Sequence, residues 1–599
     1  MKQFFKFMFA SMLGTILSGV LLIFLFFAIA AGIVAASMSD LQNKDKMVNV
    51  KENSILKLDL NQLIGDRGNK SDDIEIDLGP FGQPGSIGVN TIVENLEKAA
   101  KDDRIKGIYL KSTFPIAGYA NLSEIRDALT AFKESGKWIL TYDEIYGQAG
   151  YYLASVADEI YLFPEGVTEI SGFSANLMFF KNMLEKIGVE AQVIRGKNNK
   201  FKSAVEPFLN TEMSEANKKQ TLGYIGDRWE IVKGQIAASR GLQPSDIDFI
   251  ADNLSSRNAQ GAKESGLIDA IVYEDEFLSI LAEKVGAKNI DDINFVELSK
   301  YKNAKLPDYK RNTAKDEIAI IYANGEINSG KSDENSIGSQ TFATTIRDLR
   351  LDDDVKGAVL RINSPGGSAL ASEVIWRELV LLAAEKPLVV SMGNVAASGG
   401  YYIATPAAKI YANANTITGS IGVFGILPNF KKLATEKIGL SFDGVKTNKF
   451  SDLGNLSRGL TTEEYNIIQG QVEQTYSTFL QRVADGRKLS VNFVDSIGQG
   501  RVWSGVDALE IGLVDELGDI EDAIAEVAKM AELESYKTKG YPKIKDPIQK
   551  LLEELNVETV SMKIAESYIS EPELINAFRE IEKIKSLKGV QMRLPFIVE

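Results

Sequence analysis

The chain has 599 residues, of which 44% are apolar and 25% charged, with a formal net charge of −15. This length exceeds one ordinary hydrophobic core and predicts a multidomain globular protein. Histidine and cysteine are absent, which excludes a Ser-His-Asp triad, thiol nucleophiles, disulfides and thiolate metal sites. The acidic balance, without clustered Lys and Arg, argues against nucleic acid. We therefore expect no nucleic-acid partner, no metal and no cofactor.

An uncharged apolar stretch begins the chain. It covers residues 7–38 and is long enough to span a bilayer, for which about twenty apolar residues suffice. Lys2 and Lys6 precede it and Asp40 follows it, so the positive-inside rule keeps the N-terminus in the cytoplasm. We predict an uncleaved transmembrane anchor at 1–40, with the remaining mass across the membrane. The sequence "IVAAS" near its end resembles a signal cleavage site, and cleavage is the alternative.

Two copies of one sequence follow the anchor. At an offset of 250 residues, "GIYLKSTFP" (107–115) aligns with "GAVLRINSP" (357–365), and "AGYYLAS" (149–155) aligns with "GGYYIAT" (399–405). With one-residue shifts the same order continues, and "NKFKS" (199–203) aligns with "NKFSD" (448–452). The fixed order of these short matches predicts a duplicated domain.

Each copy alternates short apolar, β-rich runs with helical patterns, which is typical of βαβ units. The predicted fold class is therefore α/β, in tandem domains after a transmembrane helix. We expect the anchor at 1–40, a first repeat at 41–300, a second repeat at 301–530 and a charged, helix-prone extension without a repeat partner at 531–599. The polar stretch around 285–315 reads as the connection between the repeats.

Two positions distinguish the copies chemically. Ser398, in "GNVAASGGYYIA", aligns with Gln148, whereas Lys202 aligns with Ser451. The neighbouring Lys197 and Lys200 have lysine counterparts in the second repeat. Because a duplicated scaffold keeps its scaffold residues in both copies, chemistry is best sought where the copies differ. One copy holds the serine and the other holds the lysine.

We therefore hypothesise that Lys202 accepts the proton of Ser398. An amine acts as a base only when it is neutral, so its pKa must fall from about 10.4 to roughly 7–8. Burial at a junction between the repeats could provide the required desolvation. The alternative is that Lys202 is a solvated loop lysine.

The second copy also contains "RINSPGGSA" (361–369), directly after a predicted strand. Adjacent glycines, here Gly366 and Gly367, let backbone N–H groups approach a reacting carbonyl, which is how oxyanion holes are commonly built. The first copy reads "FPIAG" there. The alternative is an ordinary turn. Similarly, "SGGYYIA" could set Ser398 at a helix N-terminus, where the helix dipole favours negative charge, or could be only a tight turn that Gln148 makes in the first copy.

Other conspicuous residues are expected to be structural. The tyrosines Tyr401 and Tyr402 recur as Tyr151 and Tyr152 in the copy that lacks the serine, so they belong to the scaffold. Glu206, which follows Lys202, is expected to fix the loop rather than to exchange protons.

Four motifs resemble the long form of the signal peptide peptidase A family: "KSAVEPF" (202–208), "SPGG" (364–367), "AASGGYYIA" (396–404) and "TGSIGV" (418–423). The resemblance extends over nearly the whole chain. It implies that Lys202 is the general base and Ser398 the nucleophile. It further implies that Ser420 orients the lysine amine and that Gly366 offers an oxyanion N–H.

The resemblance also implies a Clp-peptidase/crotonase-like fold in both repeats and a membrane-anchored homo-oligomer, expected to be a tetramer. Its substrates would be remnant signal peptides and other apolar peptides. The expected location is the bacterial inner membrane, single-pass, with the catalytic domains on the periplasmic side. Without the resemblance, the residues predict only a Ser/Lys hydrolase on a duplicated α/β domain outside the cytoplasm.

Two other functions remain as alternatives. A crotonase-like acyl-CoA enzyme would also use paired N–H groups for an oxyanion, but it would need coenzyme A, which is scarce outside the cytoplasm. A noncatalytic membrane scaffold descended from a peptidase would keep the fold without the activity. Labelling of Ser398 by a fluorophosphonate probe would argue against the scaffold.

Overall fold

The computed structural model describes residues 48–68, 86–307, 312–333, 336–544 and 590–593, together with short stretches between residues 3 and 21. Most of the predicted anchor at 1–40 lies outside the described residues. Among the helices that are described, none is long and apolar enough to cross a membrane. The described residues form the α/β architecture that the alternating pattern predicts.

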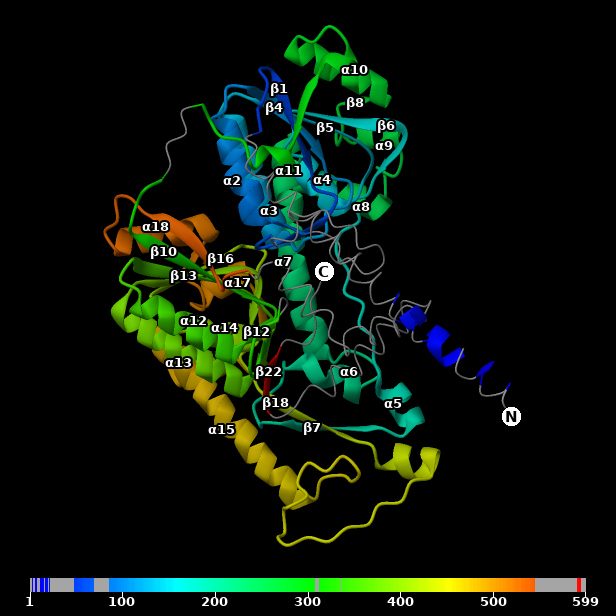
Figure 1. Cartoon of the computed structure of the whole chain (residues 1–599), viewed down its shortest axis with the longest axis vertical. Helices are drawn as coiled ribbons and strands as arrows, with labels where there is room; N and C mark the ends of the chain where they lie inside the picture. The colour runs from blue at the N-terminus through cyan, green and yellow to red at the C-terminus, as the bar shows by residue number, and fades with distance from the viewer. Residues whose placement is uncertain are drawn as a thin grey trace.

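The first repeat is built on a parallel six-stranded sheet, shown in the upper part of Figure 1, in the order β8-β6-β5-β4-β1-β9. Its strands are β1 (Ser54–Asp59), β4 (Ile105–Lys111), β5 (Trp138–Tyr146), β6 (Glu159–Thr168), β8 (Ala270–Ile271) and β9 (Asn294–Glu297). Its helices are α2 (Val89–Ala100), α3 (Tyr119–Glu134), α4 (Gln148–Ala154), α8 (Pro244–Asn253), α9 (Ala259–Glu264), α10 (Glu274–Val285) and α11 (Leu298–Tyr301). Helices cover the sheet, so its strands read as continuous apolar runs rather than alternating ones.

The second repeat has the corresponding sheet in the order β19-β17-β15-β13-β10-β21, with β16 paired to β15 and β20 paired to β16. Its strands are β10 (Glu317–Asn324), β13 (Val355–Ser364), β15 (Leu388–Ala397), β16 (Lys409–Ala412), β17 (Ile417–Gly419), β19 (Val502–Ser504), β20 (Glu516–Leu517) and β21 (Lys537–Tyr541). Its helices are α12 (Ser339–Leu351), α13 (Ala369–Glu385), α14 (Gly399–Ala404), α16 (Val491–Ile497), α17 (Gly505–Glu510) and α18 (Ile520–Met530).

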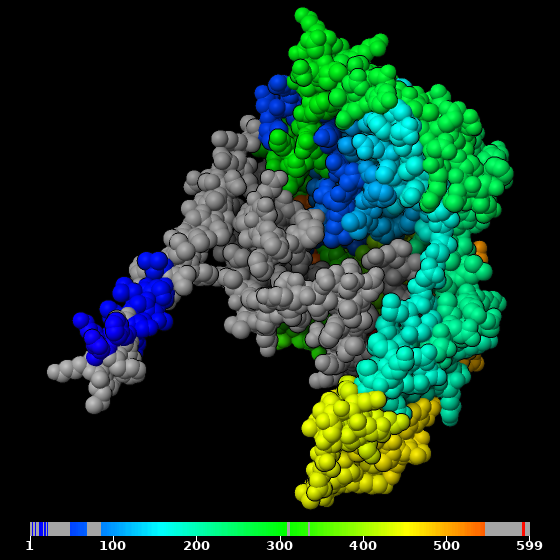
Figure 2. All heavy atoms as spheres, turned by 90° about the vertical axis from the view of Figure 1, so that its right-hand side faces the viewer, coloured from blue at the N-terminus to red at the C-terminus, as the bar shows by residue number. Residues whose placement is uncertain are grey.

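A third sheet joins the two repeats, in the order β12-β11-β14-β22-β18-β7. It consists of β7 (Glu190–Arg195) from the first repeat and of β11 (Glu326–Asn328), β12 (Ser336–Gly338), β14 (Gly366–Ser368), β18 (Phe424–Asn429) and β22 (Val590–Arg593) from later in the chain. The antiparallel pairing of β7 with β18 crosses between the repeats. In Figure 2 the cyan segment that precedes β7 descends from the first repeat towards the yellow residues of the second.

Two long helices also take part in this junction. The two longest described helices are α7 (Glu215–Arg240) and α15 (Thr462–Arg487), one from each repeat. In Figure 1, α7 runs from the first repeat down alongside the second, and α15 extends to the lower end of the molecule. The remaining strands, β2 (Leu63–Gly65) and β3 (Ser86–Gly88), pair in a small parallel sheet, and the remaining α-helices of the described repeats are α5 (Lys181–Ile187) and α6 (Glu206–Leu209).

The chain after α18 differs from the prediction. Residues 537–541 form β21, which pairs parallel with β10 at the sheet edge, as β9 pairs with β1 in the first repeat. Residues 590–593 form a second strand, β22. The prediction of a helix-prone extension without a repeat partner is therefore wrong for these two segments. Residues 545–589 and 594–599 lie outside the described residues. Likewise, the stretch predicted as the connection contains β9 and α11.

Candidate active site

Ser398 lies at the sharp turn between β15 and α14. Its backbone adopts φ 57° and ψ −115°, a sparsely populated conformation for a residue with a side chain. The two following glycines permit the turn, because a Cβ at Gly399 would lie 2.7 Å from Oγ of Ser372 and a Cβ at Gly400 would lie 2.7 Å from the carbonyl oxygen of Ser364. A strained strand-to-helix turn of this kind directs a nucleophilic hydroxyl out of the backbone.

Lys202 reaches this turn from the first repeat. Its Nζ lies 2.9 Å from Oγ of Ser398, although the two residues are 196 positions apart in sequence. The side chain is only 1% exposed. Gly500 makes room for it, since a Cβ there would lie 2.4 Å from Cβ of Lys202. Lys197 and Lys200, by contrast, are exposed.

Ser420 supplies the other contacts of the amine. Nζ of Lys202 lies 2.9 Å from Oγ of Ser420 and 3.0 Å from its carbonyl oxygen. Like Ser398, Ser420 has a positive φ, 50°, and its N–H donates to the carbonyl oxygen of Arg501 at 2.7 Å. The structure thus brings together the three side chains that the sequence motifs single out.

Burial controls the charge of the lysine. Desolvation holds the pKa of Lys202 well below its ordinary value of 10.5, because an ammonium ion loses its hydration when it is buried. A low pKa favours the neutral amine, the form that can accept a proton.

The glycines of "SPGG" lie beside the serine turn. Gly366 and Gly367 have φ values of 94° and 157°, which disfavour any other residue. In this structure the N–H of Gly366 donates to Oγ of Ser364 at 3.2 Å. A Cβ at Gly366 would lie 2.6 Å from the backbone nitrogen of Gly399. The backbone of Gly366 therefore passes close to the backbone nitrogen of Gly399, next to Ser398.

Gly399 is a site residue that the sequence analysis missed. As the first residue of α14, it has an N–H without an acceptor inside the helix. The signal that could have identified it is its position directly after the candidate nucleophile, where nucleophile turns on other folds place an oxyanion donor.

β22 occupies the space next to these glycines. It pairs antiparallel with β14, where Gly367 faces Met592, and antiparallel with β18 on its other side. Met592 is fully buried in the core of the second repeat. A strand from near the end of the chain therefore lies between the two strands that border the site.

Comparison with known proteins identifies the family. Residues 131–288 and 381–534 both match Peptidase family S49. The chain belongs to peptidase family S49. As a member of that family it is a serine peptidase, and the two matches, one in each repeat, make it the long form that the sequence motifs predicted.

Three relatives agree with this assignment of the S49 peptidase. It is 39% identical to "Protease 4" of Salmonella typhi over 75% of this chain and 73% of that protein. It is 37% identical to "Protease 4" of Haemophilus influenzae over 74% and 72%. It is 35% identical to "Serine protease SPPA, chloroplastic" of Arabidopsis thaliana over 74% and 65%.

The first repeat of this S49 peptidase carries different chemistry at the equivalent turn. Gln148 is the first residue of α4 and lacks the positive φ of Ser398. Its Oε1 accepts the N–H groups of Ser171 and Gly172 at 3.0 and 2.8 Å. The two copies therefore differ in backbone conformation at this point, so the expectation that they make the same turn is wrong.

Residues expected to be structural make structural contacts. The hydroxyl of Tyr151 donates to the carbonyl oxygen of Leu267 at 2.6 Å, and that of Tyr401 donates equivalently to Leu513 at 2.7 Å. The carboxylate of Glu206 accepts hydrogen bonds from the backbone and hydroxyl of Ser214 and from the amide of Asn217.

Proposed function

We propose that the protein is a membrane-anchored serine endopeptidase in which Ser398 is the nucleophile and Lys202 the general base. The observation that carries this proposal is the 2.9 Å distance between Nζ of the buried lysine and Oγ of the serine. A neutral lysine can make all three contacts of the amine. Its two N–H groups match the two oxygens of Ser420, and its lone pair is left to accept the hydroxyl proton of Ser398.

The reaction follows from these contacts. As Oγ of Ser398 attacks the scissile carbonyl carbon, its proton passes to Nζ of Lys202. The N–H groups of Gly366 and Gly399 stabilise the oxyanion, with Gly366 exchanging its bond to Ser364 for one to substrate and Gly367 keeping the loop in shape. The lysine then protonates the leaving amine. Water, deprotonated by the same lysine, hydrolyses the acyl-enzyme and restores Ser398.

The substrate would bind as an extended strand between β14 and β18. β22 already pairs in that place and buries Met592 in the core of the second repeat. Addition of a strand gives affinity through main-chain hydrogen bonds and specificity through alternate side chains. This geometry supports apolar peptide substrates.

We further infer that the substrates are remnant signal peptides. This step rests on the resemblance of the four motifs to the signal peptide peptidase A family. The anchor at 1–40 and the periplasmic position of the repeats rest on the apolar N-terminal stretch and its flanking lysines.

Assembly into a homo-oligomer, expected to be a tetramer, is also part of the proposal. It is supported by exposed apolar side chains in the segment 438–445, where Ile438, Phe442 and Val445 are 61%, 52% and 102% exposed. Contiguous exposed apolar residues of this kind mark interaction surfaces.

Ser398→Ala tests the nucleophile. We expect hydrolysis of an apolar peptide ester to fall by at least ~10³-fold, with assembly by size-exclusion chromatography unchanged. A fluorophosphonate probe should label the wild-type protein at Ser398 and fail to label the variant. Hydrolysis by the variant at the wild-type rate would refute the mechanism, and absence of both labelling and hydrolysis in the wild type would favour the noncatalytic scaffold.

A further inference from the structure

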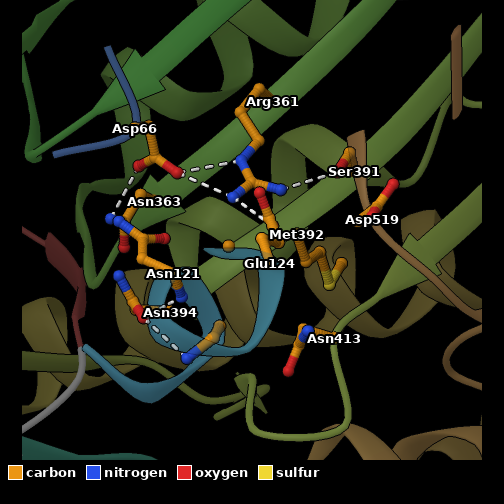
Figure 3. Close-up of polar contacts among 12 residues, drawn as sticks. Asp66, Asn121, Glu124, Arg361, Asn363, Ser391, Met392, Asn394, Asn413 and Asp519 are labelled. Atoms are coloured by element: carbon orange, nitrogen blue, oxygen red, sulfur yellow. Dashed lines mark hydrogen bonds and ion pairs between the residues drawn. The ribbon is translucent and has the colours of Figure 1, made fainter. Parts of the chain in front are cut away.

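Three buried polar side chains and one partly buried side chain, that of Asn363, meet where the two repeats touch, near the end of β13 (Figure 3). The first repeat contributes Asp66 and Glu124, and the second contributes Arg361 and Asn363. Arg361 donates through Nε to Oδ1 of Asp66 at 2.9 Å and through Nη2 to Oε1 of Glu124 at 2.6 Å. Arg361 is 1% exposed and both carboxylates are 4% exposed. We call these four residues the inter-repeat cluster.

Stability alone does not explain the inter-repeat cluster. Removing charges from water costs free energy that a buried ion pair often fails to recover, and apolar replacements are frequently as stable. Here two carboxylates share one guanidinium, and burial raises the pKa of Glu124 to about 7. We therefore look for the role of the inter-repeat cluster in what its geometry positions rather than in the stability it adds.

Asn363 connects the inter-repeat cluster to the strand that carries Ser398. Its Nδ2 donates to Oδ2 of Asp66 at 2.8 Å, and its Oδ1 accepts the backbone N–H of Val395 at 3.1 Å. Val395 lies in a bulge of β15, since Ile362 faces Met392 while Ser364 faces Ala396. The bulge withdraws the N–H of Val395 from regular pairing, and the Asn363 side chain replaces the missing acceptor.

A second contact from the first repeat holds the same bulge. Oδ1 of Asn394 accepts the N–H groups of Ala120 and Asn121 at 3.0 and 3.2 Å, at the start of α3. The N-cap of that helix is Gly118, which has no side chain to cap it. The second repeat thus caps a helix of the first, and α3 carries Glu124 of the inter-repeat cluster.

The position of Asn363 links both halves of the catalytic machinery. It directly precedes Ser364, which holds the N–H of Gly366, and through Val395 it reaches β15, which ends at Ala397 next to Ser398. We propose that Asp66 and Asn363 are positioning residues, which fix the nucleophile and the oxyanion donors relative to each other. This inference rests on the proposed role of Ser398.

In the first repeat, as far as the structure describes it, the equivalent residue makes no such bridge. Thr113 is the counterpart of Asn363 at the 250-residue offset, and its hydroxyl donates to Asp143 at 2.7 Å, within its own repeat. The asparagine that bridges to the other repeat therefore belongs to the copy that holds the serine.

The test exchanges the two bridging groups. In Asp66→Asn, the single side-chain oxygen at position 66 is expected to stay with Arg361. The new amide N–H₂ then faces the N–H₂ of Asn363, so that two donors oppose each other. In Asn363→Asp, two carboxylates face each other. The double variant Asp66→Asn/Asn363→Asp restores a donor opposite an acceptor and still offers an oxygen to Arg361 and to Val395. We expect each single variant to lose about 10- to 100-fold in kcat with KM within about twofold, and the double variant to recover most of the loss.

Glu317→Gln is the matched control. Glu317 is a buried carboxylate, 2% exposed, that binds Lys539 in the same sheet. It lies at the start of β10, opposite Val355 at the start of β13, hence at the far end of the sheet from Asn363. We expect this variant to lose thermal stability and to keep kcat.

The outcomes separate the two proposals. The positioning role would be overturned if the single variants kept the wild-type kcat. It would also be overturned if the double variant recovered thermal stability but not kcat. If a single variant does not fold, Asn363→Ala, which removes both bonds without opposing like groups, is measured in its place and should show the same loss of kcat. Fluorophosphonate labelling of Ser398 should slow in parallel with kcat. Wild-type activity that survives Ser398→Ala would instead overturn the proposed function, and with it the positioning of Ser398 by Asp66 and Asn363.

Discussion

At the scale of residues, the candidate site depends on one lysine whose surroundings differ from those of its neighbours. Lys202 is buried while Lys197 and Lys200 are exposed, and the serine it approaches has a positive φ that its counterpart Gln148 lacks. The exchange of side chains between the repeats could be predicted from the sequence. The backbone change could not, because a conformation with positive φ at a non-glycine residue is imposed by the surrounding packing rather than by local preference.

The base is tested by Lys202→Arg. Because burial lowers the pKa of Lys202, we expect wild-type kcat/KM to rise with pH through that lowered pKa and to level off before ordinary lysines titrate. Arginine keeps its proton in proteins, so Lys202→Arg should lose at least ~10³-fold in activity. The measurement is ester hydrolysis from pH 6 to 10.

Lys197→Arg and Lys200→Arg are the controls and should change activity by less than about threefold, since both side chains are exposed and the charge is kept. An inactive Lys200→Arg, or an active Lys202→Arg with the wild-type pH profile, would contradict the assignment.

Burial of the same amine predicts how stability depends on pH. The folded-state pKa of Lys202 lies below its ordinary value of 10.5, so between these two values the unfolded chain binds more protons and the free energy of unfolding rises with pH. For one proton the slope is at most about 1.4 kcal/mol per pH unit. Lys202→Met removes this contribution.

Thermal unfolding of the two proteins across pH 7 to 10.5 should therefore show the wild type gaining stability relative to Lys202→Met as pH rises. Lys200→Met, at an exposed position, should give a constant difference. A constant difference for Lys202→Met as well would mean that the lysine is protonated in the folded protein.

At the scale of elements, the alternating pattern predicted βαβ repeats but not the strands that complete the site. β14 and β22 have three and four residues, and each is a strand only because another strand lies beside it. Gly366 and Gly367 are poor strand formers on their own. Sequence periodicity could not reveal β22, since its partners Gly367 and Phe424 lie more than 150 positions away in the chain.

Deletion of residues 590–599 tests the relation between β22 and substrate. Because β22 pairs with β14 where the substrate strand would bind, its removal should lower KM for a short apolar peptide by about tenfold or more, with kcat little changed. Met592→Asp, which introduces a charge into a fully buried position, should act in the same direction. A rise in KM would show that β22 forms part of the binding site instead of competing for it.

At the scale of the whole molecule, the duplication could be predicted because short matches recur in a fixed order. The way the repeats dock could not be predicted, because it depends on contacts such as Arg361 with Asp66 and β7 with β18, which join residues far apart in sequence. Arg361 aligns with Lys111 at the repeat offset, and only the structure reveals that the arginine is buried among carboxylates of the other repeat.

The proposed orientation of the molecule is tested on unlysed spheroplasts. If the segment 1–40 is an anchor with its N-terminus in the cytoplasm, a protease added to spheroplasts should digest the protein beyond Asp40. A cytoplasmic marker protein should remain intact in the same sample. Protection of the repeats until the cells are lysed would reverse the orientation.

The pairing of β22 with β14 also has a kinetic consequence. Both strands belong to one chain, so their encounter is intramolecular and its frequency does not fall when the protein is diluted. The effective concentration of a competitor within the same chain is on the order of millimolar. Under the proposal that substrate binds in the place of β22, a free peptide has to exceed that local concentration, weighted by its relative affinity, before it displaces the strand. Inhibition of this kind would persist after washing, and long substrates with several anchoring side chains would gain an advantage over short ones.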